Sequence, residues 1–169
     1  AALFELWNVT KTSNNFGGSG YPSMEEMWDD ILSSGTIIYG TFTDDMHTLR
    51  GEYSWEYANP GRGWIIVRAD RLPPDVLTDA IRRGEFYATN GVELEDYYVH
   101  DERMVITLPE DENRGYRVFF IGKGGEILKT TEENPALYHF TRAEMYVRAK
   151  IISSDGETAF TQPYFSQYF

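Results

Sequence analysis

The side chains in this sequence best suited to chemistry form an Asp-x-His pattern, Asp45-Met46-His47. A carboxylate oxygen and a neutral imidazole nitrogen both bind hard or borderline divalent metals such as manganese, iron and zinc. The pattern alone is a weak signal, because a loop Asp can equally hydrogen-bond a neighbouring His or cap a turn. Since two ligands do not complete a metal site, the pair predicts only part of one.

The elements that must position this pair alternate in type along the first half of the chain. An apolar run at residues 36–42 predicts a strand that ends just before the Asp-x-His pattern. A capping box at Ser23 and helical apolar spacing predict a helix that stops near Gly35, and a second helix is expected with Pro73 and Pro74 in its first turn and its end at Gly84. Near-continuous apolar runs at 64–67 and 86–89 predict two further strands. This order is typical of an α/β fold with a mostly parallel sheet, whose carboxyl edge gathers ligand-binding side chains.

The second half of the sequence changes character after Gly91. It contains short alternating apolar runs separated by turn residues, at 103–108, 116–121, 125–129 and 144–152. Period-two alternation predicts antiparallel strands that bury one face. We therefore expect two parts, an α/β part over residues 1–91 and an antiparallel β module over residues 92–169.

Composition narrows the functional classes. The chain has 169 residues, 41% of them hydrophobic, with 15 Lys+Arg against 27 Asp+Glu and a formal net charge of −12. That acidity disfavours binding to a nucleic-acid backbone, which proteins meet with surplus Lys and Arg. The absence of Cys excludes disulfides and thiolate metal sites. No apolar run is long enough to span a bilayer, and the sequence does not indicate a compartment.

Several segments of the first half, in this order, resemble the C-terminal half of a PHP (polymerase and histidinol phosphatase) domain. They are residues 4–8 (FELWN), 28–35 (WDDILSSG), 39–47 (YGTFTDDMH), 63–69 and 80–91. Residues 146–163 are similar to a small β domain appended in one branch of that family. The resemblance implies the C-terminal part of a distorted (β/α)7 barrel followed by a small antiparallel, sandwich-like domain.

The resemblance also implies a function and roles for individual residues. It implies a site with two or three divalent ions (Mn, Fe or Zn), in which Asp45 and His47 match the last ligand pair, on neighbouring metals. Glu5 and Asn8 match a strand-end motif that shapes this site, and Asp44 is expected to do the same. The implied chemistry is hydrolysis of a small-molecule phosphoester, in which the metals lower the pKa of a water and the resulting hydroxide attacks phosphorus.

The chain departs from the family pattern in its ligands. The other family ligands lie upstream of the strand with which this sequence begins, and His47, His100 and His139 are the only histidines. A complete barrel needs roughly 200 residues or more. We therefore expect a missing N-terminal half, as an upstream segment or a cleaved fragment. The alternative is a metal-free, noncatalytic protein that recognises carbohydrate or a protein partner.

Substrate contacts are expected from the loop that follows the Asp-x-His pattern. Arg62, flanked by glycines, and Arg50 are candidates to bind a substrate phosphate through paired hydrogen bonds. Trp55 is a candidate to contact an apolar or sugar-like leaving group. The alternatives are solvated arginines and an aromatic side chain that packs the loop onto the core.

Overall fold

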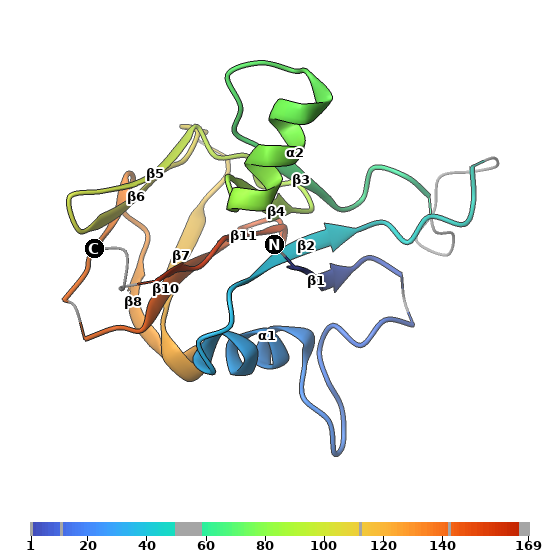
Figure 1. Cartoon of the computed structure of the whole chain (residues 1–169), viewed down its shortest axis with the longest axis horizontal. Helices are drawn as coiled ribbons and strands as arrows, with labels where there is room; N and C mark the ends of the chain where they lie inside the picture. The colour runs from blue at the N-terminus through green and yellow to red at the C-terminus, as the bar shows by residue number, and fades with distance from the viewer. Residues whose placement is uncertain (1, 11, 50–58, 112, 142, 166–169) are drawn as a thin grey trace.

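A computed structural model describes residues 2–10, 12–49, 59–111, 113–141 and 143–165 of the chain (Figure 1). The helices are α1 (Met24–Ser33) and α2 (Pro74–Arg83), and a short 3-10 turn is η1 (Lys123–Gly125). The strands are β1 (Ala2–Asn8), β2 (Ile38–Thr43), β3 (Trp64–Val67), β4 (Phe86–Thr89), β5 (Asp96–His100), β6 (Arg103–Thr107), β7 (Tyr116–Ile121), β8 (Ile127–Thr131), β9 (Ala136–His139), β10 (Tyr146–Ser153), β11 (Thr158–Thr161) and β12 (Tyr164–Phe165).

These strands form three sheets. The large sheet has seven strands in the order β3-β4-β11-β10-β7-β8, with β12 also paired to β10. The small sheet has the order β5-β6-β9, and β1 pairs with β2 in a two-stranded sheet. The β1–β2 ladder is parallel, whereas every other ladder among the described residues is antiparallel.

The expected fold class, the C-terminal part of a (β/α)7 PHP barrel with a mostly parallel sheet, is wrong. The structure is mainly β, with 41% strand and 15% helix, and no such barrel is evident in the described part of the chain. The strands at 64–67 and 86–89 pair with each other in antiparallel fashion, and β4 then pairs with β11. The continuous apolar sequence of β4 reflects burial on both faces, which a central strand of a layered antiparallel sheet shares with a strand of a parallel barrel. Strand β3 has a similar sequence, but it lies at the edge of the sheet and is only half-buried.

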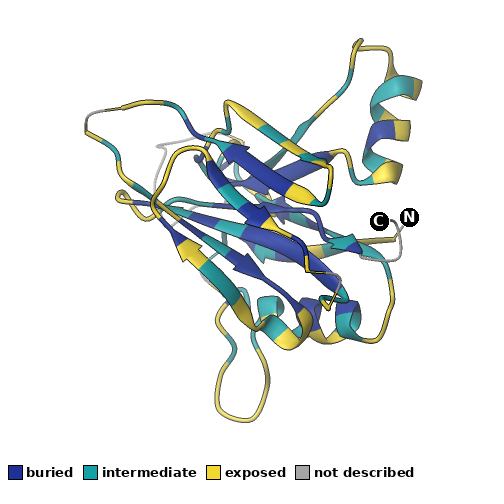
Figure 2. Ribbon diagram, turned by 90° about the vertical axis from the view of Figure 1, so that its left-hand side faces the viewer, coloured by how far each residue is buried: buried dark blue, intermediate teal, exposed yellow. Residues whose placement is uncertain are grey.

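The large sheet is covered on both faces, so its buried strands lie in the middle of the molecule (Figure 2). One face packs against the small sheet, with Phe120 and Ile151 meeting Met104 of β6 in one core cluster. The opposite face packs against α1 and the β1–β2 pair. There a second cluster contains Leu6, Trp28, Leu32, Phe42, Ala88, Tyr146, Phe160 and Phe165.

Helix α1 forms where the sequence predicted it. Ser23 caps the helix, since its side chain accepts the Glu26 amide hydrogen while the Glu26 carboxylate accepts the Ser23 amide hydrogen. This capping box satisfies backbone donors that a helix start leaves unpaired. Helix α2 ends at Gly84, whose φ of 77° is the left-handed conformation that favours glycine at a helix C-terminus. Both helices were therefore correctly predicted from local signals.

A buried ionic network attaches α1 to the large sheet. Arg148 on β10 is fully buried, and its guanidinium donates to both carboxylate oxygens of Asp29 at 2.8 and 2.6 Å. The same group donates to Glu25 at 2.9 Å and lies over the Trp28 ring, 5.0 Å from its centroid. Lys150 donates to the second oxygen of Glu25 at 2.5 Å. The apolar face of the helix is thus held beside a charge cluster in which each carboxylate is paired with Arg148, while the Nη1 atom of Arg148 is buried without a hydrogen-bond partner.

This network predicts a pH dependence of stability at Glu25. Burial alone raises the pKa of this carboxyl, but the charges and hydrogen bonds of Arg148 and Lys150 outweigh it and leave the pKa below its ordinary value of 4.5. A lowered native pKa stabilises the fold above the unfolded pKa, and that stability is lost as the pH falls through the native value. We expect Glu25→Gln to lower the free energy of unfolding by about 1–2 kcal/mol at pH 7.

Urea denaturation at several pH values measures this difference. It should shrink below about pH 4.5, as the native carboxyl of the parent chain becomes protonated. Glu110→Gln, which alters an exposed carboxylate, serves as the control and should change the free energy of unfolding little at any of these pH values. A Glu25→Gln difference that stays constant down to pH 3 would contradict this account.

A side chain joins the β1–β2 sheet to the large sheet. Gln162, which follows β11, accepts the Gly40 amide hydrogen and donates to the Gly40 carbonyl, both at 2.9 Å. Its amide therefore pairs with β2 as a neighbouring strand would. The close approach requires glycine, because a Cβ at position 40 would lie 2.9 Å from the Leu6 side chain and 3.1 Å from the Trp28 ring. Among the described residues, the helices are too short or too polar to cross a membrane.

Candidate functional site

The parallel pairing of β1 and β2 gathers the predicted site residues at one edge. Asn8 lies opposite Thr43 in the ladder, and both strands run in the same direction (Figure 1). Residues at and beyond these two positions therefore share the carboxyl edge, where side chains converge in parallel pairs. Asn8, Asp44, Asp45 and His47 belong to this edge, and the Glu5 side chain reaches it through hydrogen bonds with Asn8 and Thr43.

Asn8 organises the cluster from a largely buried position. Its side-chain amide donates to Asp45 Oδ2 at 3.1 Å and to Glu5 Oε1 at 3.4 Å. Its carbonyl oxygen accepts two hydrogen bonds from Thr10, at 2.9 and 2.7 Å. Glu5 also accepts the Thr43 hydroxyl at 2.5 Å. Asn8 thus holds the Oδ2 atom of the Asp45 carboxylate by a hydrogen bond and makes no such bond to the Oδ1 atom.

The other Asp45 oxygen lies near His47. The distance from Asp45 Oδ1 to His47 Nε2 is 3.6 Å, and these side chains are 45% and 69% exposed. Asp45 has a φ of 46°, a left-handed conformation that is uncommon outside glycine and that recurs at functional sites. In the part of the chain that the structure describes, no group of three or more His, Asp or Glu is placed to hold a metal. The pair therefore offers two accessible metal-ligand atoms, and a complete metal site needs further ligands.

Asp44 has a different task from its neighbour. Its carboxylate accepts the backbone amide hydrogens of Gly61, Arg62 and Gly63, at 2.7, 2.7 and 2.8 Å. These charge-assisted bonds anchor the loop at residues 61–63 beside the carboxyl edge of β1 and β2. The anchored Arg62 donates to the Val9 carbonyl at 3.4 Å, which places its guanidinium at the end of β1. Arg50 and Trp55 lie outside the described residues.

The charge of this edge suits a cation. Glu5, Asp44 and Asp45 contribute three carboxylates to this edge. The structure places one positively charged side chain, Arg62, beside them in the described part of the chain. Three backbone donors offset the charge of Asp44 alone. The Asp45 and Glu5 carboxylates therefore leave a negative field around an exposed imidazole, which attracts divalent cations.

The Asp44 anchor gives a direct prediction. Asp44→Ala removes the acceptor of three backbone amides, so we expect the free energy of unfolding to fall by about 2 kcal/mol. We also expect the amide hydrogens of residues 61–63 to exchange faster with solvent. Urea denaturation and hydrogen exchange by NMR measure the two effects. Asp70→Ala, at an exposed loop position, is the matched control, and equal effects of the two substitutions would contradict the anchor.

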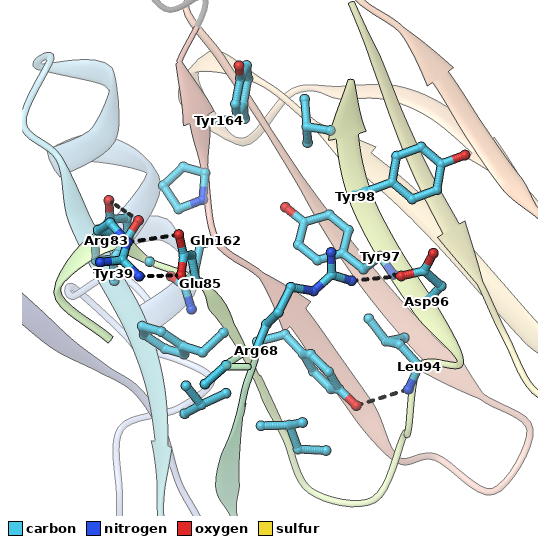
Figure 3. A pocket seen from close by; sticks show the side chains of 18 of the residues that line it. Tyr39, Arg68, Arg83, Glu85, Leu94, Asp96, Tyr97, Tyr98, Gln162 and Tyr164 are labelled. Atoms are coloured by element: carbon cyan, nitrogen blue, oxygen red, sulfur yellow. Dashed lines mark hydrogen bonds and ion pairs between the residues drawn. The ribbon is translucent and has the colours of Figure 1, made fainter. Parts of the chain in front are cut away.

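The structure also contains a cleft that the sequence did not indicate. It has a volume of about 900 Å³ and lies where α2 ends, between β4 and β12 of the large sheet and β5 of the small sheet. Its walls include Tyr39, Arg68, Tyr97, Tyr98 and Tyr164 (Figure 3). These residues come from segments far apart in the chain, so no local spacing could have revealed it.

Comparison with known proteins adds no relative to this description. No protein-family model, no curated protein and no solved structure matches the chain. Function is therefore inferred from the geometry and charge of the two sites.

Proposed function

We propose that this chain contributes Asp45 and His47 to the site of a divalent-metal-dependent hydrolase that acts on a small-molecule phosphoester. One observation carries the proposal, namely the convergence of Asp45 and His47 with Glu5 and Asn8 at the carboxyl edge of β1 and β2. The likeness of residues 4–8 and 39–47 to the PHP family supports it. The proposal concerns this strand-end site and involves no barrel.

The donors fit a divalent ion of the manganese, iron or zinc type. Asp45 Oδ1 and His47 Nε2 would hold it, since both are exposed and both are ligand types that such ions accept. When bound, the ion supplies Lewis acidity, which lowers the pKa of a water and stabilises charge on a phosphoryl group. Two or three such ions would require further ligands, which we assign to a segment or subunit outside the described residues.

The remaining residues of the edge position the ligands and the substrate. Asn8 holds Asp45 by its Oδ2 atom, so the carboxylate cannot rotate freely. Asp44 fixes the loop that carries Arg62, and the Arg62 guanidinium is the group suited to bind a phosphoester oxygen. The edge therefore combines metal donors, a carboxylate-orienting amide and a phosphate-binding cation.

The test uses the protein purified from its natural source, together with any segment or subunit that accompanies this chain. Bound metal is measured by mass spectrometry, and hydrolysis of p-nitrophenyl phosphate is followed with added Mn²⁺ or Zn²⁺. We expect Asp45→Asn and His47→Gln, introduced at the native locus, each to lower the hydrolysis rate by at least about 100-fold, because loss of a ligand exceeds the usual effect of outer-shell changes. Removal of metal by a chelator should abolish activity.

His100→Gln is the matched control for these variants. His100 also lies beside an aspartate, with 3.0 Å between its Nδ1 atom and Asp101 Oδ2, and it is similarly exposed. It belongs to the β5–β6 hairpin rather than to the β1–β2 edge. We expect unchanged activity and metal content in this variant. Full activity in the Asp45→Asn and His47→Gln variants would overturn the proposal.

A further inference from the structure

The cleft of about 900 Å³ is separate from the Asp45 edge. Tyr39, which lines it, lies near the start of β2, whereas Asp45 follows the end of that strand. Tyr39 and Thr43 alone are four residues apart, or roughly 13 Å along a strand. The cleft therefore opens near the opposite end of β2 from the Asp45 edge.

Aromatic side chains form much of its walls. Tyr39 packs edge-on against Phe86, with 6.1 Å between ring centroids, and its hydroxyl donates to the Arg83 carbonyl at 3.0 Å. Tyr97 and Tyr98 line the cleft from β5, and Figure 3 shows the Tyr97 ring pointing into it, whereas the Tyr98 ring points away and the residue is 43% exposed. Aromatic rings of this kind offer a flat apolar surface together with a polar edge.

Charged side chains line the cleft in pairs. Arg68 donates to Asp96 at 2.7 Å, and Figure 3 shows this pair beside Tyr97 on one side. Arg83 donates to both oxygens of Glu85 at 2.8 Å on the other side. Both lining arginines thus have a carboxylate partner, and Glu95 adds a further negative charge. A phosphate or other anion would have to displace one of these carboxylates.

The Tyr97 hydroxyl remains a hydrogen-bond donor at neutral pH. Burial raises the pKa of Tyr97 to about 12, although a hydrogen bond with Thr161 and the charge of Arg68 oppose the shift. The cleft therefore presents phenol, guanidinium and carboxylate groups close to aromatic faces. Donors and acceptors lie side by side, and the lining carries little net charge.

We propose that this cleft binds a neutral saccharide of about two rings. Sugar rings have apolar C–H faces that pack on aromatic rings, and their adjacent hydroxyls both donate and accept hydrogen bonds. The Arg68–Asp96 pair supplies the matching donor and acceptor beside Tyr97 and Tyr98. The volume lies within the range of small-molecule sites, roughly 300–1,000 Å³. The paired charges favour a neutral ligand over a phosphorylated one.

Saturation-transfer NMR tests the proposal with maltose, cellobiose and N,N′-diacetylchitobiose as probes. We expect saturable binding of at least one of them, with a dissociation constant on the order of 1 mM. Tyr97→Ala and Arg68→Gln should each weaken that binding about tenfold. Tyr21→Ala and Arg82→Gln are the controls, since Tyr21 is likewise a tyrosine and Arg82 also pairs with an aspartate, at 3.0 Å, but neither lines the cleft.

Two results would overturn the proposal. One is the absence of binding by all three disaccharides at about 20 mM, well above the expected constant. The other is displacement of the bound sugar by millimolar inorganic phosphate, which would assign the arginines to an anion. A chelator should leave sugar binding unchanged, so that failure here and failure of the metal-site proposal are told apart.

Discussion

Replacing Arg148 by Met is expected to lower the free energy of unfolding by about 3–5 kcal/mol, because it leaves a buried carboxylate without its partner. Asp29 is 4% exposed, and both of its oxygens accept hydrogen bonds from Arg148. After the substitution, only the Tyr146 hydroxyl, at 2.8 Å, remains to pair with Asp29 among these contacts. Urea denaturation of the parent and variant chains measures the loss.

The double variant Arg148→Met, Asp29→Leu distinguishes an unpaired charge from lost packing. Since apolar residues of similar volume often replace a buried ion pair at little cost, we expect it to recover most of the lost stability. Arg117→Met is the control, because Arg117 also donates to a carboxylate, Glu132, but that pair is exposed and is worth about 1 kcal/mol or less. A double variant as unstable as Arg148→Met alone would contradict the charge explanation.

Gln162→Leu is expected to lower the free energy of unfolding by about 2–4 kcal/mol, since it leaves the amide and carbonyl of Gly40 without their partner. Leu approximates the volume of Gln but offers no donor or acceptor. Thermal or urea denaturation measures the change. Asn14→Leu is the control, because the Asn14 amide donates to the Pro22 carbonyl at the surface and its loss should cost little.

The pH dependence of Gln162→Glu tests the same contact. A protonated carboxyl can donate to the Gly40 carbonyl, whereas a carboxylate cannot and would repel it. Burial beside that carbonyl should raise the native pKa, so the stability gained from the protonated form is present at low pH and is lost as the pH rises through that value. We therefore expect Gln162→Glu to be closer to the parent chain at pH 4 than at pH 8. The opposite order would argue against this pairing.

Local signals predicted the positions of elements and the antiparallel strands of the second half, but not the antiparallel pairing of β3 with β4. The Ser23 capping box and Gly84 act within a few residues, so both helices could be located from sequence. The runs at 64–67 and 86–89 were correctly identified as strands, but their apolar content does not specify which strands pair with them or in which direction. That choice depends on β11, about 70 residues further along the chain.

The candidate sites also divide into parts that depend on neighbouring residues and parts that depend on distant segments of the chain. Asp45 and His47 were identifiable because they are two residues apart and follow an apolar strand. The three amides held by Asp44 could not be predicted, since they depend on how the loop at 61–63 folds back. The cleft was also unpredictable, because Tyr39, Arg68 and Tyr98 meet only after three sheets have packed.

Two contacts join residues that are far apart in the sequence, and this affects folding during synthesis of the chain. Gly40 pairs with a side chain 122 residues later, and Asp29 with one 119 residues later. As the chain leaves the ribosome, Trp28 and Leu32 emerge long before β10 and β11, which bury them. Contacts of such high sequence separation form slowly, and exposed apolar surface meanwhile favours aggregation. We therefore expect this chain to be most prone to aggregate while only its first half has been synthesised.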